Sequence, residues 1–277
     1  MSFTTLMVHV DVDIKSDARV RLAAQLAERF TSTLIGISAC IRPPYPAEGA
    51  YFATREFVEQ ERQDILAVLQ RTGASFRAAA GGNGAKLKWL EWRSTIGVPE
   101  RFVVSEARSA DLVIVGRPSS PVDISRCLNP GAVVLMLGRP MLVVPPGIDK
   151  LKAERIIVGW KDSREARRAL QDSLPLLHEA KSVAIVEVCD ASLEPPARQH
   201  VEDVAHYLTR HRISVGSATT GVAEHGIADY LIDLARVERA DLIVTGAYGH
   251  SRLGEWIFGS ATRELLASSP MCCLMSN

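Results

Sequence analysis

A glycine-rich segment near the end of the chain has residue types that can hold a phosphate group. An apolar run ends at Thr245, and the chain then reads Gly246-Ala247-Tyr248-Gly249 and, after nine further residues, Gly259-Ser260-Ala261-Thr262. Glycine has no Cβ, so it can adopt a positive φ, and phosphate oxygens can approach its N–H group. We predict that a helix begins at Ser260, where unpaired N–H groups and the helix dipole favour an anion. The hydroxyl groups of Ser260 and Thr262 can add donors.

The segments around this motif alternate between strand and helix patterns. Short apolar runs are separated by stretches of helical periodicity, which is typical of βαβ units and of a parallel sheet buried on both faces. Ligands of such sheets bind at the carboxyl ends of strands where the winding reverses, so a glycine-rich loop after the fourth strand lies at that crevice. In the second half of the chain we predict strands at 155–160, 182–188, 213–218, 241–245 and 271–275.

The helices of this half also leave signals in the sequence. Ser163 is a candidate N-cap of the first helix. The third helix carries an apolar stripe, interpreted as ordinary core, at Ile227, Leu231, Leu234 and Ala235. Three histidines lack the i,i+4 spacing of a metal site and are interpreted as a solvated helix face: His200, His206 and His211.

An internal repeat divides the chain into two similar halves. The run Ala110-Asp111-Leu112-Val113-Ile114-Val115-Gly116 recurs as Ala240-Asp241-Leu242-Ile243-Val244-Thr245-Gly246. A length of 277 residues suits two domains. We predict an α/β protein with two tandem doubly wound parallel sheets of five strands, as domains 1–148 and 151–277 on either side of Pro145-Pro146-Gly147. In the first half the strands are expected near 5–10, 33–38, 87–92, 111–115 and 141–144, with helices at 17–31 and 54–80.

Composition excludes several classes of function. Lys+Arg and Asp+Glu are balanced at 32 each, so no charge excess favours nucleic acid or an anionic membrane as a partner. The N-terminal residues do not form a signal peptide, and the apolar runs are far shorter than the roughly 20 residues of a membrane helix, so we expect a soluble cytoplasmic protein. Five cysteines without CxxC or zinc-type spacing predict reduced, buried thiols and no metal site.

The Gly-x2-Gly-x9-Gly-Ser pattern behind a buried strand resembles the ATP-binding signature of the universal stress protein family. The strand at 155–160 with Asp162-Ser163 after it, and the ending Cys273-Leu274-Met275-Ser276, are similar to that family as well, so the resemblance covers essentially the whole chain as a tandem member. It implies flavodoxin-like or adenine nucleotide α-hydrolase-like (Rossmann-like) sheets, with the nucleotide between the first and fourth strands. It also implies that the two halves pair through their last strands as an intramolecular pseudo-dimer.

The resemblance assigns roles to particular residues. The contact with adenine falls on Val188, at the end of the second strand of this half. The family's usual acidic residue after the first strand aligns with Lys161, and Asp162 stands one place later. Lys161 is therefore expected to meet a phosphate or to point to solvent. The ligand implied is ATP, or else AMP or ADP, with Mg²⁺ as a companion of ATP. The contacts with phosphate and ribose fall on Gly246, Gly249, Gly259, Ser260 and Ala261.

The first half departs from this pattern. It reads Gly116-Arg117-Pro118-Ser119 at the corresponding place, and the next glycine, Gly131, comes two residues too late. Pro118, Pro121 and Pro130 remove backbone donors that a phosphate would need. We therefore predict no triphosphate binding in this half, although Asp11 stands where the family's acidic residue is expected.

Three functions remain open from the sequence. The first is a stress-response regulator that binds an adenine nucleotide, with a homodimer or another protein as a further partner. The second is a slow ATPase or nucleotidyl-transfer enzyme, which the sequence disfavours because only Glu255 and Asp162 stand near the motif as water-activating carboxylates. The third is a scaffold that works without nucleotide. We predict no dedicated catalytic residue.

Overall fold

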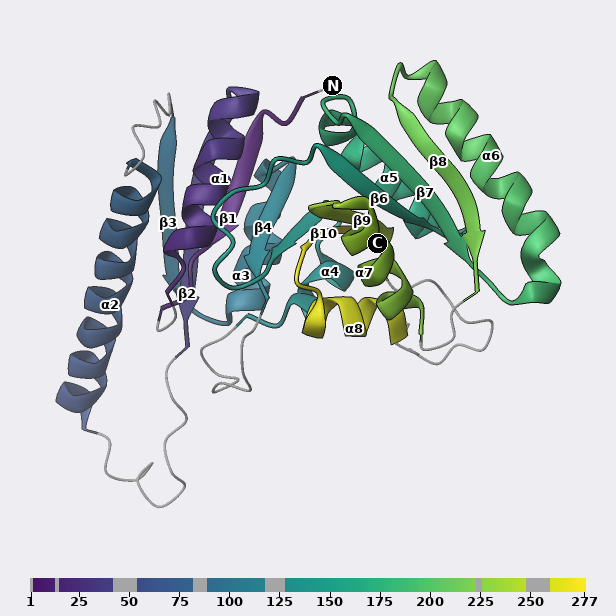
Figure 1. Cartoon of the computed structure of the whole chain (residues 1–277). Helices are drawn as coiled ribbons and strands as arrows, with labels where there is room; N and C mark the ends of the chain where they lie inside the picture. Colours follow the sequence, from purple (N-terminus) through teal and green to yellow (C-terminus); the bar gives the residue numbers. More distant parts are fainter. Residues whose placement is uncertain are drawn as a thin grey trace.

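The computed structural model of the protein describes residues 2–12, 15–41, 54–81, 89–117, 128–222, 226–247 and 260–277. Within these residues ten strands form one sheet in the order β3-β2-β1-β4-β5-β10-β9-β6-β7-β8 (Figure 1). Neighbouring strands are parallel, except that β5 and β10 are antiparallel. Each half of the chain is thus a parallel five-stranded sheet in which the first and fourth strands are adjacent. The predicted fold class is confirmed.

The elements of the first half follow the predicted order of strands and helices. Their bounds are β1 Thr5–His9, α1 Asp17–Phe30, β2 Thr33–Cys40, α2 Arg55–Gly81, β3 Leu90–Ile96, α3 Pro99–Glu106, the 3-10 helix η2 Ala107–Ser109, β4 Leu112–Gly116, α4 Pro130–Met136 and β5 Met141–Val144.

The elements of the second half repeat this order. Their bounds are β6 Arg155–Trp160, α5 Arg164–Leu177, β7 Ser182–Val188, the 3-10 helix η3 Ala191–Leu193, α6 Glu194–Arg210, β8 Val215–Gly221, α7 Ile227–Glu238, β9 Leu242–Gly246, α8 Ser260–Ser268 and β10 Cys272–Ser276. Ser163 caps α5 as predicted, because its Oγ accepts a hydrogen bond from the Ala166 N–H at 3.2 Å.

Two strands begin and end at least two residues later than the sequence predicts. These are β3, expected at 87–92, and β8, expected at 213–218. Both lie at the ends of the ten-stranded sheet, where α2 and α6 pack beside them (Figure 1). Edge strands are partly solvated, so their second halves carry polar residues such as Ser94 and Thr219 that hide the strand pattern.

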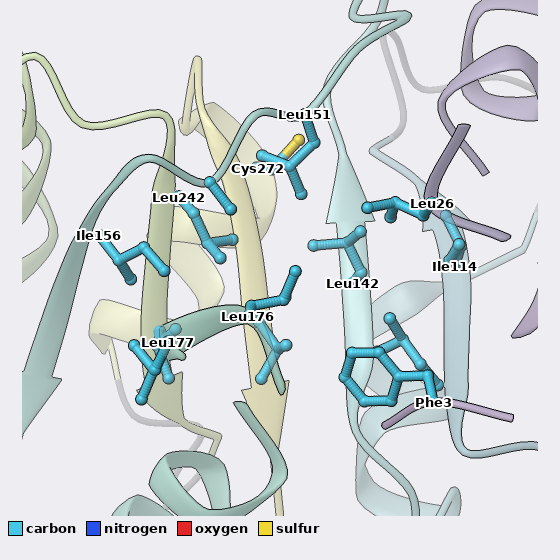
Figure 2. Packing of buried hydrophobic residues seen from close by; sticks show 14 of the residues in the cluster. Phe3, Leu26, Ile114, Leu142, Leu151, Ile156, Leu176, Leu177, Leu242 and Cys272 are labelled. Carbon is cyan, nitrogen blue, oxygen red and sulfur yellow. The ribbon is translucent and has the colours of Figure 1, made fainter. Parts of the chain in front are cut away.

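Helices cover both faces of the sheet. Side chains of α1, α2, α5 and α6 pack into one core cluster, and those of α3, α4, α7 and α8 pack into a second cluster on the opposite face. The first cluster runs across both halves without interruption, from Ile114 and Leu142 to Leu242 and Ile156 (Figure 2). None of the described helices combines the length and apolar character that crossing a bilayer requires.

The two halves are joined through their last strands. In the antiparallel pair of β5 and β10, Val143 lies opposite Cys273, and these two residues are equivalent in the internal repeat. Arginine side chains add contacts across this joint, because Arg117 donates to the carbonyl oxygen of Ala267 at 2.6 Å and Arg168 donates to that of Gly138 at 2.7 Å. The arrangement confirms the predicted intramolecular pseudo-dimer.

The repeated Ala-Asp pair has a structural role. The Asp111 carboxylate accepts hydrogen bonds from the Thr4 and Thr5 N–H groups at 2.7 and 2.9 Å. The Asp241 carboxylate accepts from the Lys152 and Ala153 N–H groups at 3.0 and 2.9 Å. Both aspartates precede their strands, so they fix the backbone at the amino ends of the sheet. The Ala-Asp pair of the repeat therefore lies at the ends of the strands opposite to the predicted ligand site.

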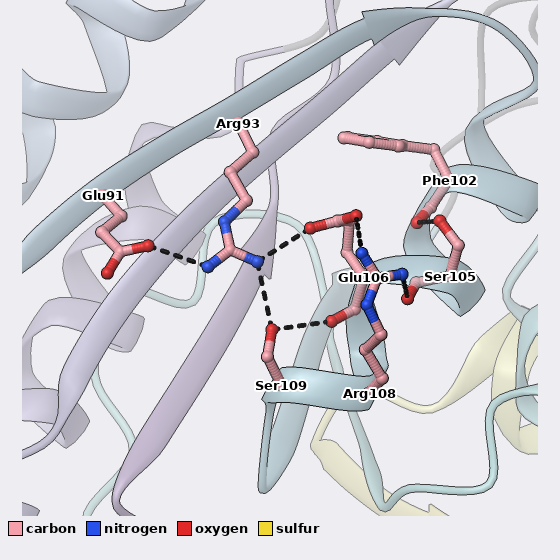
Figure 3. A network of polar contacts seen from close by, with 7 residues as sticks. All are labelled: Glu91, Arg93, Phe102, Ser105, Glu106, Arg108 and Ser109. Atoms are coloured by element: carbon pink, nitrogen blue, oxygen red, sulfur yellow. Dashed lines mark hydrogen bonds and ion pairs between the residues drawn. The ribbon is translucent and has the colours of Figure 1, made fainter.

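A polar network ties edge strand β3 to α3 (Figure 3). Arg93 donates to the carboxylates of Glu106 at 2.8 Å and Glu91 at 2.9 Å, and to Ser109 Oγ at 3.1 Å. These hydrogen bonds from Arg93, first of all the one to Glu106, raise the pKa of the arginine. The network lies near the surface, where such ion pairs contribute about 1 kcal/mol or less each.

The cysteines among the described residues form no disulfide with one another, and Cys40, Cys272 and Cys273 are buried as predicted, whereas Cys189 is only partly buried. Cys272 belongs to one core cluster and Cys273 to the other, so their side chains point to opposite faces of β10. Burial raises the pKa of the Cys273 thiol to about 11. Both thiols are therefore protonated and packed as small apolar side chains.

Candidate functional site

A cavity of about 260 Å³ lies at the carboxyl ends of β6, β7 and β9, which we call the β6–β9 crevice. Trp160, Val188 and Gly246 line it from the three strand ends, on the face of the sheet that α7 and α8 cover. The strands β6 and β9 are neighbours, and the helices that follow them leave on opposite faces of the sheet. The crevice thus lies where the winding of the doubly wound sheet reverses, which is the usual position of a ligand in this architecture.

Most of the site residues predicted from the sequence lie together in this crevice. They are Gly246, Ser260, Ala261, Thr262, Val188 and Lys161. Asp162 does not line the crevice, because its side chain forms an ion pair with Arg167 and lines a second cavity on the other side of β6. Gly249 and Gly259 lie outside the described residues.

The absence of a side chain at Gly246 is explained by the packing of α5. A Cβ atom on this residue would lie 2.6 Å from the backbone nitrogen of Ala166 and 2.8 Å from the carbonyl carbon of Glu165. The φ of Gly246 is not in the left-handed region, so the glycine is required by this close approach and not by the positive φ that the sequence suggested. The contact brings the amino end of α5 to the crevice.

Three helices point their amino ends at the crevice. The first residues of α5, α7 and α8 line it, through Glu165, Ile227 and Ser260. The first N–H groups of a helix have no partner within the helix, and its dipole places positive potential at that end. Three converging amino ends therefore favour a ligand with negative charge.

One wall of the crevice is apolar. Val186 and Val188 from β7 face Ile227 and Leu231 from α7. The sequence placed Ile227 in the core, but 41% of its surface is exposed, and both α7 residues line the crevice, so that interpretation was incomplete. Gly159 keeps this side open, because a Cβ atom there would lie 3.0 Å from the Leu231 side chain. An apolar slot of this kind can accept a flat ring.

Two charged groups line the crevice from α5 and the turn before it. Lys161 is exposed, and the Glu165 carboxylate is buried and pairs with Arg164 at 3.1 Å. The sequence did not single out Glu165, because an acidic residue in the first turn of a helix is common. Only the packing of α5 against β9 shows that this carboxylate lies at the site.

Three polar side chains pack at the equivalent strand ends of the first half. In the repeat, His9 stands where the second half has Gly159, and its imidazole is buried. Arg19 donates from Nε to the His9 carbonyl oxygen at 3.0 Å and pairs with Asp11 at 2.6 Å. Its guanidinium occupies the space that a Cβ on Gly116 would take. We call these three side chains, His9, Asp11 and Arg19, the N-half plug.

Burial determines the charge states in the N-half plug. It lowers the pKa of His9, so the imidazole is neutral, and its Nδ1 lies 3.6 Å from Asp11, beyond hydrogen-bond distance. Burial alone would raise the pKa of Asp11, but the charge of Arg19 and its hydrogen bond outweigh this effect and hold that pKa below its ordinary value. The plug is therefore an ion pair packed beside a neutral histidine.

His200 was interpreted from the sequence as a solvated residue, but in the structure it contacts a carboxylate. Its Nδ1 lies 3.1 Å from the carboxylate of Glu187, which is largely buried on β7. Burial raises the pKa of Glu187. The described residues contain no group of three or more His, Cys, Asp or Glu side chains that could hold a metal ion.

Comparisons with known proteins agree with this architecture. Residues 152–276 match the model of the Universal stress protein family. A universal stress protein from Archaeoglobus fulgidus DSM 4304 superposes with a TM-score of 0.73 at 12% identity, over 99% of this chain and 98% of that chain. A functionally unknown protein from Pseudomonas aeruginosa PAO1 superposes with a TM-score of 0.57 at 13% identity, over 99% and 92% of the two chains. The comparison with curated proteins gave no match.

Proposed function

We propose that this chain, of which residues 152–276 match the model of the Universal stress protein family, is a member of that family and binds an adenine nucleotide in the β6–β9 crevice. The observation that carries the proposal is the convergence of three helix amino ends and an apolar slot at one cavity. The first feature suits phosphates and the second suits a purine ring. We infer that the protein is a nucleotide-dependent regulator of the stress response, with ATP as the expected ligand and ADP or AMP as alternatives.

The two ends of the crevice suggest how the nucleotide lies. We expect the adenine ring to contact Val188 and Ile227, in the apolar slot. The phosphates would lie at the first turn of α8, with the Lys161 ammonium beside them. The Glu165 carboxylate would accept a hydrogen bond from a ribose hydroxyl. A cavity of about 260 Å³ is small for a whole ligand site, so base and ribose would fill it and the phosphates would extend past Ser260.

The repeat and the N-half plug support one nucleotide for each chain. We propose two domains, 1–148 and 151–277, of which only the second binds ATP. The first half has the buried His9 imidazole where the second half has Gly159, and its Arg19 guanidinium lies against Gly116. Its role would then be to pair with the second half through β5 and β10. We further expect a cytoplasmic protein that can form homodimers or bind another protein, and Mg²⁺ bound together with ATP.

A slow ATPase is the second candidate function. If the phosphates instead lay at the amino end of α5, the buried Glu165 carboxylate would be a group able to orient or activate water, which the sequence did not suggest. Its pairing with Arg164 keeps the carboxylate in place. A scaffold without nucleotide is the third candidate, and it has no specific observation in its favour.

Nucleotide binding can be tested on the intact purified protein. Isothermal titration calorimetry with ATP, ADP and AMP gives the affinities, and mass spectrometry identifies nucleotide that copurifies with the protein. The variant Ala261→Glu places a negative charge at the amino end of α8, and we expect at least about tenfold weaker ATP binding, or roughly 1.4 kcal/mol. The matched control Ala267→Glu makes the same change at an exposed position of α8 and should keep the affinity.

The outcomes separate the three candidates. Retained ATP without turnover supports the regulator, and release of ADP and phosphate that stops in Glu165→Gln supports the ATPase. If neither the native protein nor the control variant binds any adenine nucleotide, the crevice does not have the proposed function.

A further inference from the structure

A second cavity of about 380 Å³ lies between α5 and α6, on the opposite face of the sheet from the β6–β9 crevice. We call it the α5–α6 cavity. We propose that it is a binding site for a small organic cation, an amine whose ammonium group is attached to an apolar body. The proposal concerns a ligand other than the nucleotide and does not depend on nucleotide binding.

The α5–α6 cavity and the crevice are separated by the end of β6. Trp160, the last residue of the strand, lines both. After it the side chains alternate, because Lys161 lines the crevice and Asp162 lines the α5–α6 cavity. The turn between β6 and α5 thus presents a cation on one side and a carboxylate on the other.

The floor of the α5–α6 cavity is apolar and aromatic. Trp160, Leu170 and Val204 are buried there, and Tyr207 is half-buried beside them. The cavity of about 380 Å³ over these side chains opens to solvent. Trp160 Nε1 is buried and has no hydrogen-bond partner among the described residues. An open groove beside an indole ring is suited to the apolar body of a ligand.

The rim of the α5–α6 cavity carries an excess of negative charge. Asp162 and Asp203 both line it, and the lining also includes the positively charged Arg167. Arg167 pairs with Asp162, which neutralises both groups. Asp203 has no ion pair with any other described residue, so its carboxylate remains available at the rim. The nearby His200 is occupied by the Glu187 carboxylate.

This combination identifies the class of ligand. An ammonium group beside Asp203 would also lie near the aromatic rings of the floor, where a cation gains from the ring face as well as from the carboxylate. The hydrocarbon part of the ligand would cover Leu170 and Val204 and remove apolar surface from water. The Asp203 carboxylate would repel an anionic ligand, because no cationic side chain among the described residues pairs with it. An uncharged ligand would leave that carboxylate without an ion-pair partner.

The test uses 2-phenylethylamine as the probe, with phenylacetate and 2-phenylethanol as the anionic and neutral counterparts. Binding to the nucleotide-free full-length protein is measured by calorimetry and by ligand-observed NMR. We expect the amine to bind, phenylacetate not to bind and the alcohol to bind roughly fivefold or more weakly than the amine, because a partly exposed ion pair is worth about 1 kcal/mol. No binding of the amine, or equal binding of all three probes, would overturn the proposal.

Variants show whether the probe binds at this place. Asp203→Asn should weaken binding of the amine roughly fivefold. Gln171 is exposed at the rim, and Gln171→Trp should block the cavity with a large side chain. Glu202→Gln removes a neighbouring acidic side chain of α6 that does not line the cavity, and it should leave the affinity unchanged. If Asp203→Asn and Glu202→Gln bind the amine equally well, the amine does not bind beside Asp203 in the α5–α6 cavity. ATP affinity measured on the same variants reports on the crevice separately.

Discussion

Substitution of Gly246 by alanine tests whether α5 is held against β9 as tightly as the geometry indicates. The new Cβ would lie 2.6 Å from the Ala166 backbone nitrogen. Comfortable contacts between such atoms are about 3.5–4.0 Å, so an overlap of roughly 1 Å must be relieved. Ala166 cannot turn away, because its N–H is capped by Ser163 and it is buried in the core. The amino end of α5 must therefore move as a unit.

The size of the effect follows from this overlap. Inserting a methyl group into a well-packed site costs about 1–3 kcal/mol. For a protein of this size each kcal/mol lowers Tm by about 2–4 °C, so we expect a decrease of roughly 2–12 °C. Because Ser163 and Glu165 line the crevice, the displacement of α5 should also weaken ATP binding. Chemical denaturation and calorimetry on the same preparation measure both effects.

Gly81→Ala is the matched control. A Cβ atom at this last residue of α2 meets nothing within 4 Å, and alanine is a better helix former than glycine. We expect stability to be unchanged or to rise by up to about 1 kcal/mol. If Gly246→Ala unfolds at the same denaturant concentration as the native protein and as Gly81→Ala, then the close approach of α5 does not explain the glycine.

The remaining predictions concern the N-half plug. Arg19→Ala leaves the Asp11 carboxylate buried without its partner and should lower the free energy of unfolding by about 3–5 kcal/mol. The control Arg21→Ala breaks a solvent-exposed pair and should lower it by less than about 1 kcal/mol. Similar decreases for the two variants would contradict the buried ion pair. The folded protein holds the pKa of His9 below 6.5, so only the unfolded chain protonates this imidazole as the pH falls through that value. The free energy of unfolding then decreases by up to about 1.4 kcal/mol per pH unit. His9→Gln removes this contribution, and denaturation between pH 7 and pH 5 should show a shallower decrease for the variant; parallel curves would mean that His9 titrates alike in both states.

Sequence reasoning was most accurate where one local pattern controls the structure. The strand β6, Arg155–Trp160, was predicted with its observed bounds, because an apolar run in the middle of a sheet is buried on both faces. The start of α5 was predicted from Ser163, since capping involves only neighbouring residues. The internal repeat predicted two similar halves, and their pairing through the last strands came from the family resemblance. Prediction was less accurate at the edge strands β3 and β8.

Side-chain directions at the candidate site could not be read from the sequence in the same way. Lys161 and Asp162 are neighbours in the chain, yet they line cavities on opposite faces of the sheet. Glu165 resembles an ordinary first-turn residue until α5 is packed on β9. Glu187 and His200 come from a strand and a helix, so only the packing of α6 on β7 brings them together.

The order of strands and helices, the two-fold repetition and the position of a glycine-rich loop were determined by the sequence alone, because each depends on hydrophobic periodicity or on residues that are close in the chain. The tertiary structure decided why Gly246 must lack a side chain, which carboxylate reaches the crevice and how His9 and Arg19 pack at the equivalent strand ends of the first half. These properties depend on distances between elements that are far apart in the chain, and packing sets such distances only when the whole sheet and its helices are assembled.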